Sequence, residues 1–304
     1  MRLRAFGLAG AVIVAPATLH AEPLPPQVAA VIDAAAAAKD PATLKTVADL
    51  IKKTNPASIA EIDAQVAALT AKAQKARAEK LAHQTLLQGI KGEGQIGLSN
   101  TTGESNTIGV VASLKLSAET KHWKHEIAVS ADYEKENGVT SNDQFMAGYE
   151  GAYRFTPRLY ALGTLSWERD LSFGYTSREA ASLGLGWKVL DGRKVALAFE
   201  AGPAVRDTDY IAAPEAPAYS QTEAAGRLAA IFSWKIWNKT KFTEDAAGFL
   251  ESGGNSMRLT SAITTDLLGA LKARLSYVAQ FEATTPPGIK NTDTTTRLSL
   301  VYGF

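Results

Sequence analysis

The sequence predicts an all-β transmembrane barrel of about 12 antiparallel strands, preceded by an α-helical periplasmic segment. Three observations support this prediction. From about residue 90 onward, hydrophobic and polar residues alternate, which is typical of strands with one apolar face. The alternating segments have ten or more residues, the length that a tilted strand needs to cross a bilayer. The connections between these segments alternate between short and longer, as they do in outer-membrane barrels.

The first residues have the features of a secretory signal peptide. Arg2 and Arg4 precede an apolar stretch that runs from about residue 5 to residue 17, and the small residue Ala21 precedes Glu22. A buried N-terminal helix would explain neither the charged start nor the abrupt change to EPLPPQ. We therefore expect export to the bacterial envelope, with residues 1–21 removed as a signal peptide.

Residues 22–89 form the predicted periplasmic helical segment. They are rich in Ala, Lys, Glu and Gln, and the pairs Asp40-Pro41 and Asn55-Pro56 interrupt them. Proline is favoured in the first turn of a helix, so each pair marks the start of a new one. This pattern predicts three helices, over 26–38, 41–53 and 56–89.

The last of these helices has apolar residues at alternating spacings of three and four. Such a seam indicates either a short coiled coil that binds a partner or a helix that packs on its two neighbours. Lys80 and His83 interrupt the seam and favour packing on the neighbours. On the periplasmic side, residues 22–89 would plug the barrel mouth, oligomerise, or contact peptidoglycan or another envelope protein.

The barrel region, residues 90–304, alternates apolar and polar residues along each strand. In EIAVSADYE, for example, Ile127 and Val129 lie on one face and Asp132 lies on the other. An even number of strands lets a closed antiparallel sheet begin and finish on the same side. The predicted strands cover about 92–101, 106–118, 123–135, 143–155, 158–169, 177–190, 193–206, 221–236, 240–251, 256–267, 271–283 and 293–304.

The connections and the aromatic residues give independent support. One set of connections is short (TKH, TPR, LDGR, WNKT and LLGA), whereas the other is mostly longer (TGES, KENGVTSN, DLSFGYTS, DTDYIAAPEAPAYS, SGGN and ATTPPGIKN). A soluble sandwich has no reason to sort its loops in this way. Aromatic residues fall at both ends of the strands, as the two girdles of a membrane barrel would: Trp123, Phe155, Trp187, Trp234 and Phe242 at the short turns, and Tyr133, Phe145, Trp167 and Phe281 at the longer loops.

The last residues continue the alternating pattern to the end of the sequence. Leu298, Leu300, Tyr302 and Phe304 share one face of the last predicted strand. In a barrel this strand pairs with the first, so these four residues would face lipid. A terminal Phe after alternating apolar residues also resembles the signal by which the barrel-assembly machinery recognises outer-membrane proteins, whose physical basis is strand addition to an exposed edge.

The opposite faces of the strands place charges of both signs in the predicted lumen. One interpretation is a narrow channel that selects small solutes, and the other is a network of salt bridges that fills the lumen. A barrel of about 12 strands lies between filled eight-stranded barrels and open sixteen-stranded porins. The mixture of signs favours a plugged or very narrow lumen. The predicted lumen-facing charges are Lys115, Asp132, Glu150, Arg154, Glu168, Lys188, Glu200, Arg206, Glu223, Arg227, Arg258, Arg274 and Arg297.

We expect no catalytic residue, metal or cofactor. The chain has no Cys, which excludes thiol catalysis and disulfides. A lipid-modifying enzyme with a serine–histidine site is the alternative, but its base would have to lie at the outer rim. After removal of the signal peptide the histidines are His83, His122 and His125, on the helical segment and beside a short turn, with no third metal ligand nearby. The formal net charge of +1 gives no reason to expect nucleic acid.

Several stretches of the barrel region resemble a bacterial family known as domain of unknown function 481, the salt-induced outer membrane proteins. They are GLSNTTGESNT from Gly97, LSWERDLSFGYTSR from Leu165, LGLGWKV from Leu183 and LAFEAGPAVR from Leu197. The family motif has Gly followed at once by Asn, whereas Glu104 and Ser105 intervene here. The resemblance covers about 90–304 and implies an outer-membrane β-barrel without implying a biochemical role.

Together these observations predict an outer-membrane barrel that is structural or forms a narrow channel for small solutes or ions. An interaction module that acts through residues 22–89 is a further alternative. The expected partners are outer-membrane lipid, the barrel-assembly machinery and, through residues 22–89, other envelope proteins or peptidoglycan.

Overall fold

The computed structural model describes residues 24–38, 41–83, 85, 89–102, 107–136, 139–212 and 217–304. The predicted signal peptide, residues 1–21, lies outside them. The chain forms two compact units that divide between Ala78 and Glu79, and each is described by itself.

The first unit is a small helical bundle, and prolines begin its helices as predicted. Its elements are α1 (Pro26–Ala37), α2 (Pro41–Thr54), the 3-10 turn η1 (Pro56–Ser58) and α3 (Ile59–His83). Ile32 of α1 and Ile62 of α3 are fully buried and form its core with Leu44 and Ile51 of α2. The first half of α3 therefore packs on its two neighbours. None of the helices in the described part of the chain is long and apolar enough to cross a membrane.

Helix α3 ends at His83, earlier than the predicted end at residue 89. Thr85 is not helical, and residues 84 and 86–88, which the prediction also covers, lie outside the described residues. A 3-10 turn also replaces the regular helix expected directly after Asn55.

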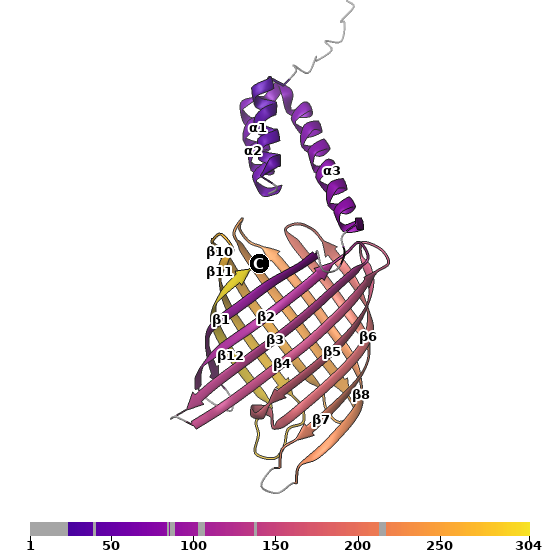
Figure 1. Ribbon diagram of the computed structural model, residues 1–304, viewed down its shortest axis with the longest axis vertical. Helices are drawn as coiled ribbons and strands as arrows, with labels where there is room; N and C mark the ends of the chain where they lie inside the picture. Colours follow the sequence, from indigo (N-terminus) through magenta and orange to yellow (C-terminus); the bar gives the residue numbers. More distant parts are fainter. Residues whose placement is uncertain are drawn as a thin grey trace, which may run out of the picture. The chain divides into compact units, whose positions relative to one another are not determined.

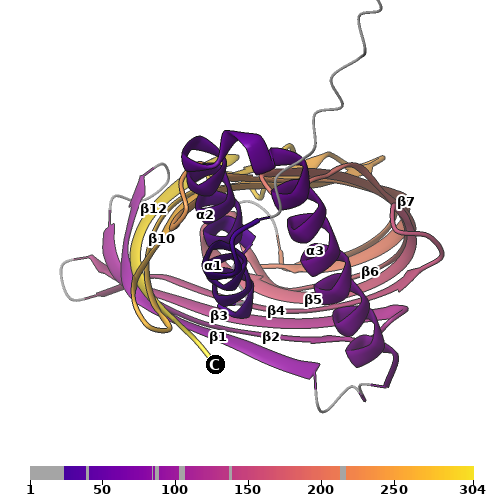
Figure 2. The same cartoon turned by 90° about the horizontal axis from the view of Figure 1, so that it is seen from above.

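The second unit is a closed barrel of antiparallel strands, which confirms the predicted fold class (Figure 1). Each strand pairs with its neighbours in the sequence, and β1 closes the wall against β12, as the view from above shows (Figure 2). The strands are β1 (Ile90–Thr102), β2 (Thr107–Glu119), β3 (Trp123–Glu136), β4 (Val139–Arg154), β5 (Leu159–Asp170), β6 (Tyr175–Asp191), β7 (Val195–Tyr210), β8 (Tyr219–Lys235), β9 (Thr240–Glu251), β10 (Ser256–Leu268), β11 (Leu271–Glu282) and β12 (Thr292–Gly303), with the short 3-10 turn η3 (Leu171–Phe173) between β5 and β6.

Several strands extend further into the predicted long loops than their sequence pattern indicates. Strand β7 continues to Tyr210 and β8 begins at Tyr219, because the two tyrosine rings stack with centroids 4.7 Å apart. The difference in loop length between the two ends consequently rests mainly on the connections 211–218 and 283–291. We call the end with these connections the long-loop end. The short-turn end carries the connections 120–122, 155–158, 192–194, 236–239 and 269–270.

The barrel wall is apolar outside and polar inside, the reverse of a water-soluble protein. Leu183, Ile96 and Leu298 are 72%, 62% and 62% exposed on the outer side. Asp132 and Glu200 are buried at inward positions. Aromatic residues lie on the outer side near both ends, among them Trp123 and Trp187 at the short turns and Phe281 at the long loops. Such a wall is typical of a barrel that lipid surrounds.

The seam between β1 and β12 closes at its short-turn end through Phe304. The N–H of Phe304 donates to the carbonyl oxygen of Gly92 at 2.9 Å, and the N–H of Gly92 donates back at 2.8 Å. The Phe304 ring covers Gly92, where an added Cβ atom would collide with it. The other apolar residues of this last face, Leu298, Leu300 and Tyr302, are exposed on the outer side. Their predicted role as an assembly signal stays a prediction.

Candidate functional site: the barrel lumen

The pairing register decides which side chains point into the lumen. Successive residues of a strand face opposite sides of the wall, so every residue that pairs directly with an inward residue also points inward. The buried Glu200, which pairs with Gly186 and Ala229, fixes this parity around the ring. By this register the following charged residues lie at inward positions: Lys115, Asp132, Glu150, Arg154, Glu168, Lys188, Glu200, Arg206, Glu223, Arg227, Arg258, Arg274 and Arg297.

A buried ion pair lies on β7 and β8 near the middle of the wall. Arg227 Nη1 donates to Glu200 Oε2 at 2.9 Å, and the Tyr160 hydroxyl donates to Glu200 Oε1 at 2.8 Å. The Glu200 side chain is only 1% exposed. Because both of its oxygens accept a hydrogen bond, Glu200 is held as a paired carboxylate rather than as a free charge.

Other ion pairs cross the lumen. Arg178 of β6 donates to Glu282 of β11 at 2.6 Å. Strands β6 and β11 lie five places apart around the ring, so this contact joins nearly opposite walls. Arg258 of β10 and Glu168 of β5 span a similar distance around the ring, with the two side chains 3.4 Å apart. These two ion pairs cross the lumen and therefore interrupt it between its two ends.

An aromatic cluster fills the lumen towards the long-loop end. Tyr175 at the start of β6 is fully buried, and its ring lies 3.8 Å beneath the guanidinium carbon of Arg178. Phe173 of η3 and Tyr210 of β7 pack against Tyr175. The cation–π contact and the ion pair therefore fix Arg178 from two sides.

The connection between β11 and β12 packs over this cluster. Gly174 follows η3 with φ at +77°, a conformation that favours glycine. A Cβ atom at Gly174 would lie 2.5 Å from Ile289 Cδ1 and 2.8 Å from Pro286 Cγ. The close approach shows that the loop from β11 to β12 is seated directly on the turn between β5 and β6. The long-loop end is thus filled by side chains and capped by a loop.

The short-turn end is hollow instead. A cavity of about 850 Å³ opens there, lined by residues of β1–β3 and β8–β12 and of two short turns. We call this cavity the vestibule. Its lining includes ten basic residues and three acidic ones, and the acidic residues are Glu93, Asp245 and Asp266. A smaller cavity of about 320 Å³ lies beyond it, where Glu126, Glu150 and Glu168 face Arg206, Arg227 and Arg258.

The histidines next to the first short turn lie in the outer aromatic belt and not in the lumen. His125 Nδ1 is 2.7 Å from the Tyr149 hydroxyl, and its ring stacks with that of Trp123 at 5.5 Å. His122 stacks with Tyr153 at 5.8 Å. His83 is exposed at the end of α3. Within the described ranges, no group of three or more metal-ligating side chains comes together.

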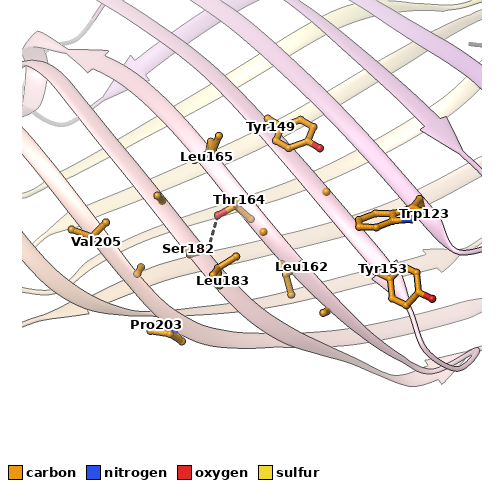
Figure 3. Close-up of a pocket in the computed structure, with 15 residues that line it drawn as sticks. Trp123, Tyr149, Tyr153, Leu162, Thr164, Leu165, Ser182, Leu183, Pro203 and Val205 are labelled. Carbon is orange, nitrogen blue, oxygen red and sulfur yellow. Dashed lines mark hydrogen bonds between the residues drawn. The ribbon is translucent and has the colours of Figure 1, made fainter. Parts of the chain in front are cut away.

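An apolar groove of about 720 Å³ lies beside this aromatic belt (Figure 3). Trp123, Tyr149 and Tyr153 lie along one part of it, and Leu183 and Val205 lie along another. Its described lining contains no charged side chain. The groove therefore offers a shape that suits an apolar chain.

A family model described as "Protein of unknown function, DUF481" matches residues 94–304, from β1 to the end of β12. The chain belongs to the DUF481 family. The match covers the barrel and not the helical unit, as the resemblance in the sequence predicted. A relative of this DUF481 protein, the uncharacterized protein YdiY of Escherichia coli (strain K12), is 25% identical over 169 residues. The matched region spans 55% of the chain and 65% of the length of YdiY.

Solved structures are similar in part to this DUF481 protein. The NanC porin has a TM-score of 0.47 at 8% identity, with 69% of the present chain and 98% of the porin covered. The translocator domain of the autotransporter NalP from Neisseria meningitidis has a TM-score of 0.46 at 12% identity, with 78% and 96% covered.

Sequence reasoning did not foresee how the lumen divides along its axis. The alternating pattern tells whether a side chain points inward but not at what height or opposite which partner it lies. It therefore missed Tyr160 and Gln280 as lumen-filling groups, although both have inward parity. It also missed Tyr175, which points inward only because the register shifts between Tyr175 and Ser177. It also left out Lys235 and Lys241, whose inward parity was available from the strand pattern.

Proposed function

We propose that this DUF481 protein is an outer-membrane barrel without catalytic activity, whose lumen is closed at rest near the long-loop end and conducts at most small ions or solutes. The bridge between Arg178 and Glu282 carries this proposal, because it joins nearly opposite walls directly against the buried Tyr175. The hollow vestibule at the other end gives water access up to that closure.

The apolar outer wall, its aromatic belts and the predicted signal peptide support an outer-membrane location. In such a location, lipid covers the outer wall and the barrel-assembly machinery inserts the chain. The helical unit has its own apolar core, which supports a separate role in contacts with peptidoglycan or another envelope protein.

The conductance of the refolded mature chain in a planar bilayer tests the closure. We expect the wild-type protein to show little steady current and the double variant R178A/E282A to conduct steadily. The substitutions remove both bridging side chains and also the guanidinium that holds the Tyr175 ring in the lumen. The matched control is R154A/E119A, which removes an ion pair of 2.7 Å at the short-turn end. This control is expected to leave the current unchanged.

Two results would contradict the proposed closure. A wild-type current as large as that of R178A/E282A would mean that the lumen is open. Silence of both proteins would mean that the Arg178 bridge is not the closing element, and a sealed structural barrel would replace the narrow channel.

A further inference from the structure

The vestibule carries an excess of basic side chains that the proposed closure does not use. Five of them project from two neighbouring short turns and their strand ends, 192–194 and 236–239: Arg193, Lys194, Lys235, Lys239 and Lys241. Within the described part of the chain none of the five forms an ion pair. By contrast, Lys115 and Lys272 on other strands of the lining bind Glu126 at 2.6 Å and Glu93 at 2.9 Å.

We propose that the vestibule is a binding site for small multivalent anions of the phosphate or polycarboxylate class, and that it gives the lumen a preference for anions. The binding site stands on the charge and shape of the cavity. The preference during conduction rests additionally on the proposed channel function.

The charge arrangement supports this proposal. Like charges held together on two adjacent turns repel one another, and a bound anion relieves that repulsion. A cavity with charge of one sign and low-dielectric walls also focuses the field and raises the local concentration of counter-ions. Of the three acidic residues in the lining, Glu93 is paired with Lys272, which leaves Asp245 and Asp266 to balance five cations.

The size and the neutral lining support a hydrophilic, multivalent ligand. A volume of about 850 Å³ is within the range of small-molecule sites. Ser233, Thr243 and Asn238 supply hydroxyl and amide donors between the charged groups. Several ammonium groups that surround one anion act together only when the anion carries more than one charge, which favours phosphates and polycarboxylates over chloride.

Calorimetric titration of the refolded mature chain with pyrophosphate, in neutral detergent at low salt, tests the site. The variant K239Q/K241Q removes two of the five cations and is expected to weaken binding about tenfold. The matched control K121Q/R158Q removes two exposed cations from other short turns at the same end that do not line the vestibule. We expect this control to change affinity by about twofold at most.

If both double variants lost the same affinity for pyrophosphate, the proposed site would be wrong, because binding would then depend on the net charge of the whole protein and not on the vestibule. Absence of pyrophosphate binding by the wild-type protein would overturn it as well.

The reversal potential of R178A/E282A in a gradient of potassium chloride tests the anion preference separately. We expect the current to favour chloride and this preference to become smaller when K239Q/K241Q is added, because eight basic residues then remain against three acidic ones. Pyrophosphate binding by a barrel whose opened variant never conducts would support the site and contradict the channel. A conducting barrel that neither binds pyrophosphate nor favours chloride would support the channel and overturn the vestibule.

Discussion

At the scale of single residues, the lumen is organised by carboxylates that accept more than one hydrogen bond. Glu200 accepts hydrogen bonds from Arg227 and Tyr160, and Glu168 accepts them from Arg178 and Arg258. A charge in a narrow polar space is costly unless it is paired, and here the pairs come from different strands. Each pair therefore ties two parts of the wall together.

Removing one partner of a buried pair should destabilise the barrel. Glu200→Ala leaves Arg227, whose side chain is 15% exposed, without its carboxylate. We expect a loss of roughly 3 kcal/mol in the free energy of unfolding in lipid vesicles, measured by urea titration. The control Asp191→Ala breaks a contact of 4.0 Å between partly exposed groups and should cost about 0–1 kcal/mol. Equal losses would show that the Glu200 pair is not held as we describe.

At the scale of elements, the closing seam between β1 and β12 depends on residues without side chains. A Cβ atom at Gly97 would lie 2.5 Å from the carbonyl oxygen of Leu298, a backbone atom of the partner strand. At Gly94, three residues earlier in the same strand, an added Cβ atom would meet nothing within 4 Å. The close pairing of β1 with β12 therefore requires a glycine at position 97 but leaves room for a side chain at position 94.

This difference gives a matched pair of substitutions. Gly97→Ala should push β12 away and lower the free energy of unfolding by roughly 1–3 kcal/mol. Gly94→Ala should be close to neutral. Urea unfolding of both variants in vesicles measures the difference, and an equal response would contradict the register that pairs Gly97 with Ser299.

The strands were largely predictable from the sequence, but their ends and the side-chain contacts between them were not. The alternation in each strand reflects a wall between lipid and a polar lumen, so the sequence records it directly. The ends of β7 and β8 depend on the stacking of Tyr210 on Tyr219, which exists only once the hairpin has formed. The contact of Arg178 with Glu282 joins residues 104 positions apart, and no local pattern contains that information.

At the scale of the whole barrel, the two ends of the lumen differ in kind. Aromatic side chains, crossing ion pairs and the β11–β12 connection fill the long-loop end, whereas the short-turn end is a basic, hollow vestibule. We propose that the short-turn end faces the periplasm, as it does in outer-membrane barrels, so that water and solutes reach the vestibule from the periplasm but not from outside the cell.

The absence of Cys in the chain permits a direct measurement of this access. Thr243→Cys places one thiol in the vestibule, and Ala218→Cys places one on the exposed connection at the long-loop end. Both variants would be treated with a bulky, membrane-impermeant maleimide in intact cells and after permeabilisation of the outer membrane. We predict that Ala218→Cys reacts in intact cells and that Thr243→Cys reacts only after permeabilisation. Labelling of Thr243→Cys in intact cells would contradict the account, because the lumen would then be open to the outside or the barrel inserted the other way round.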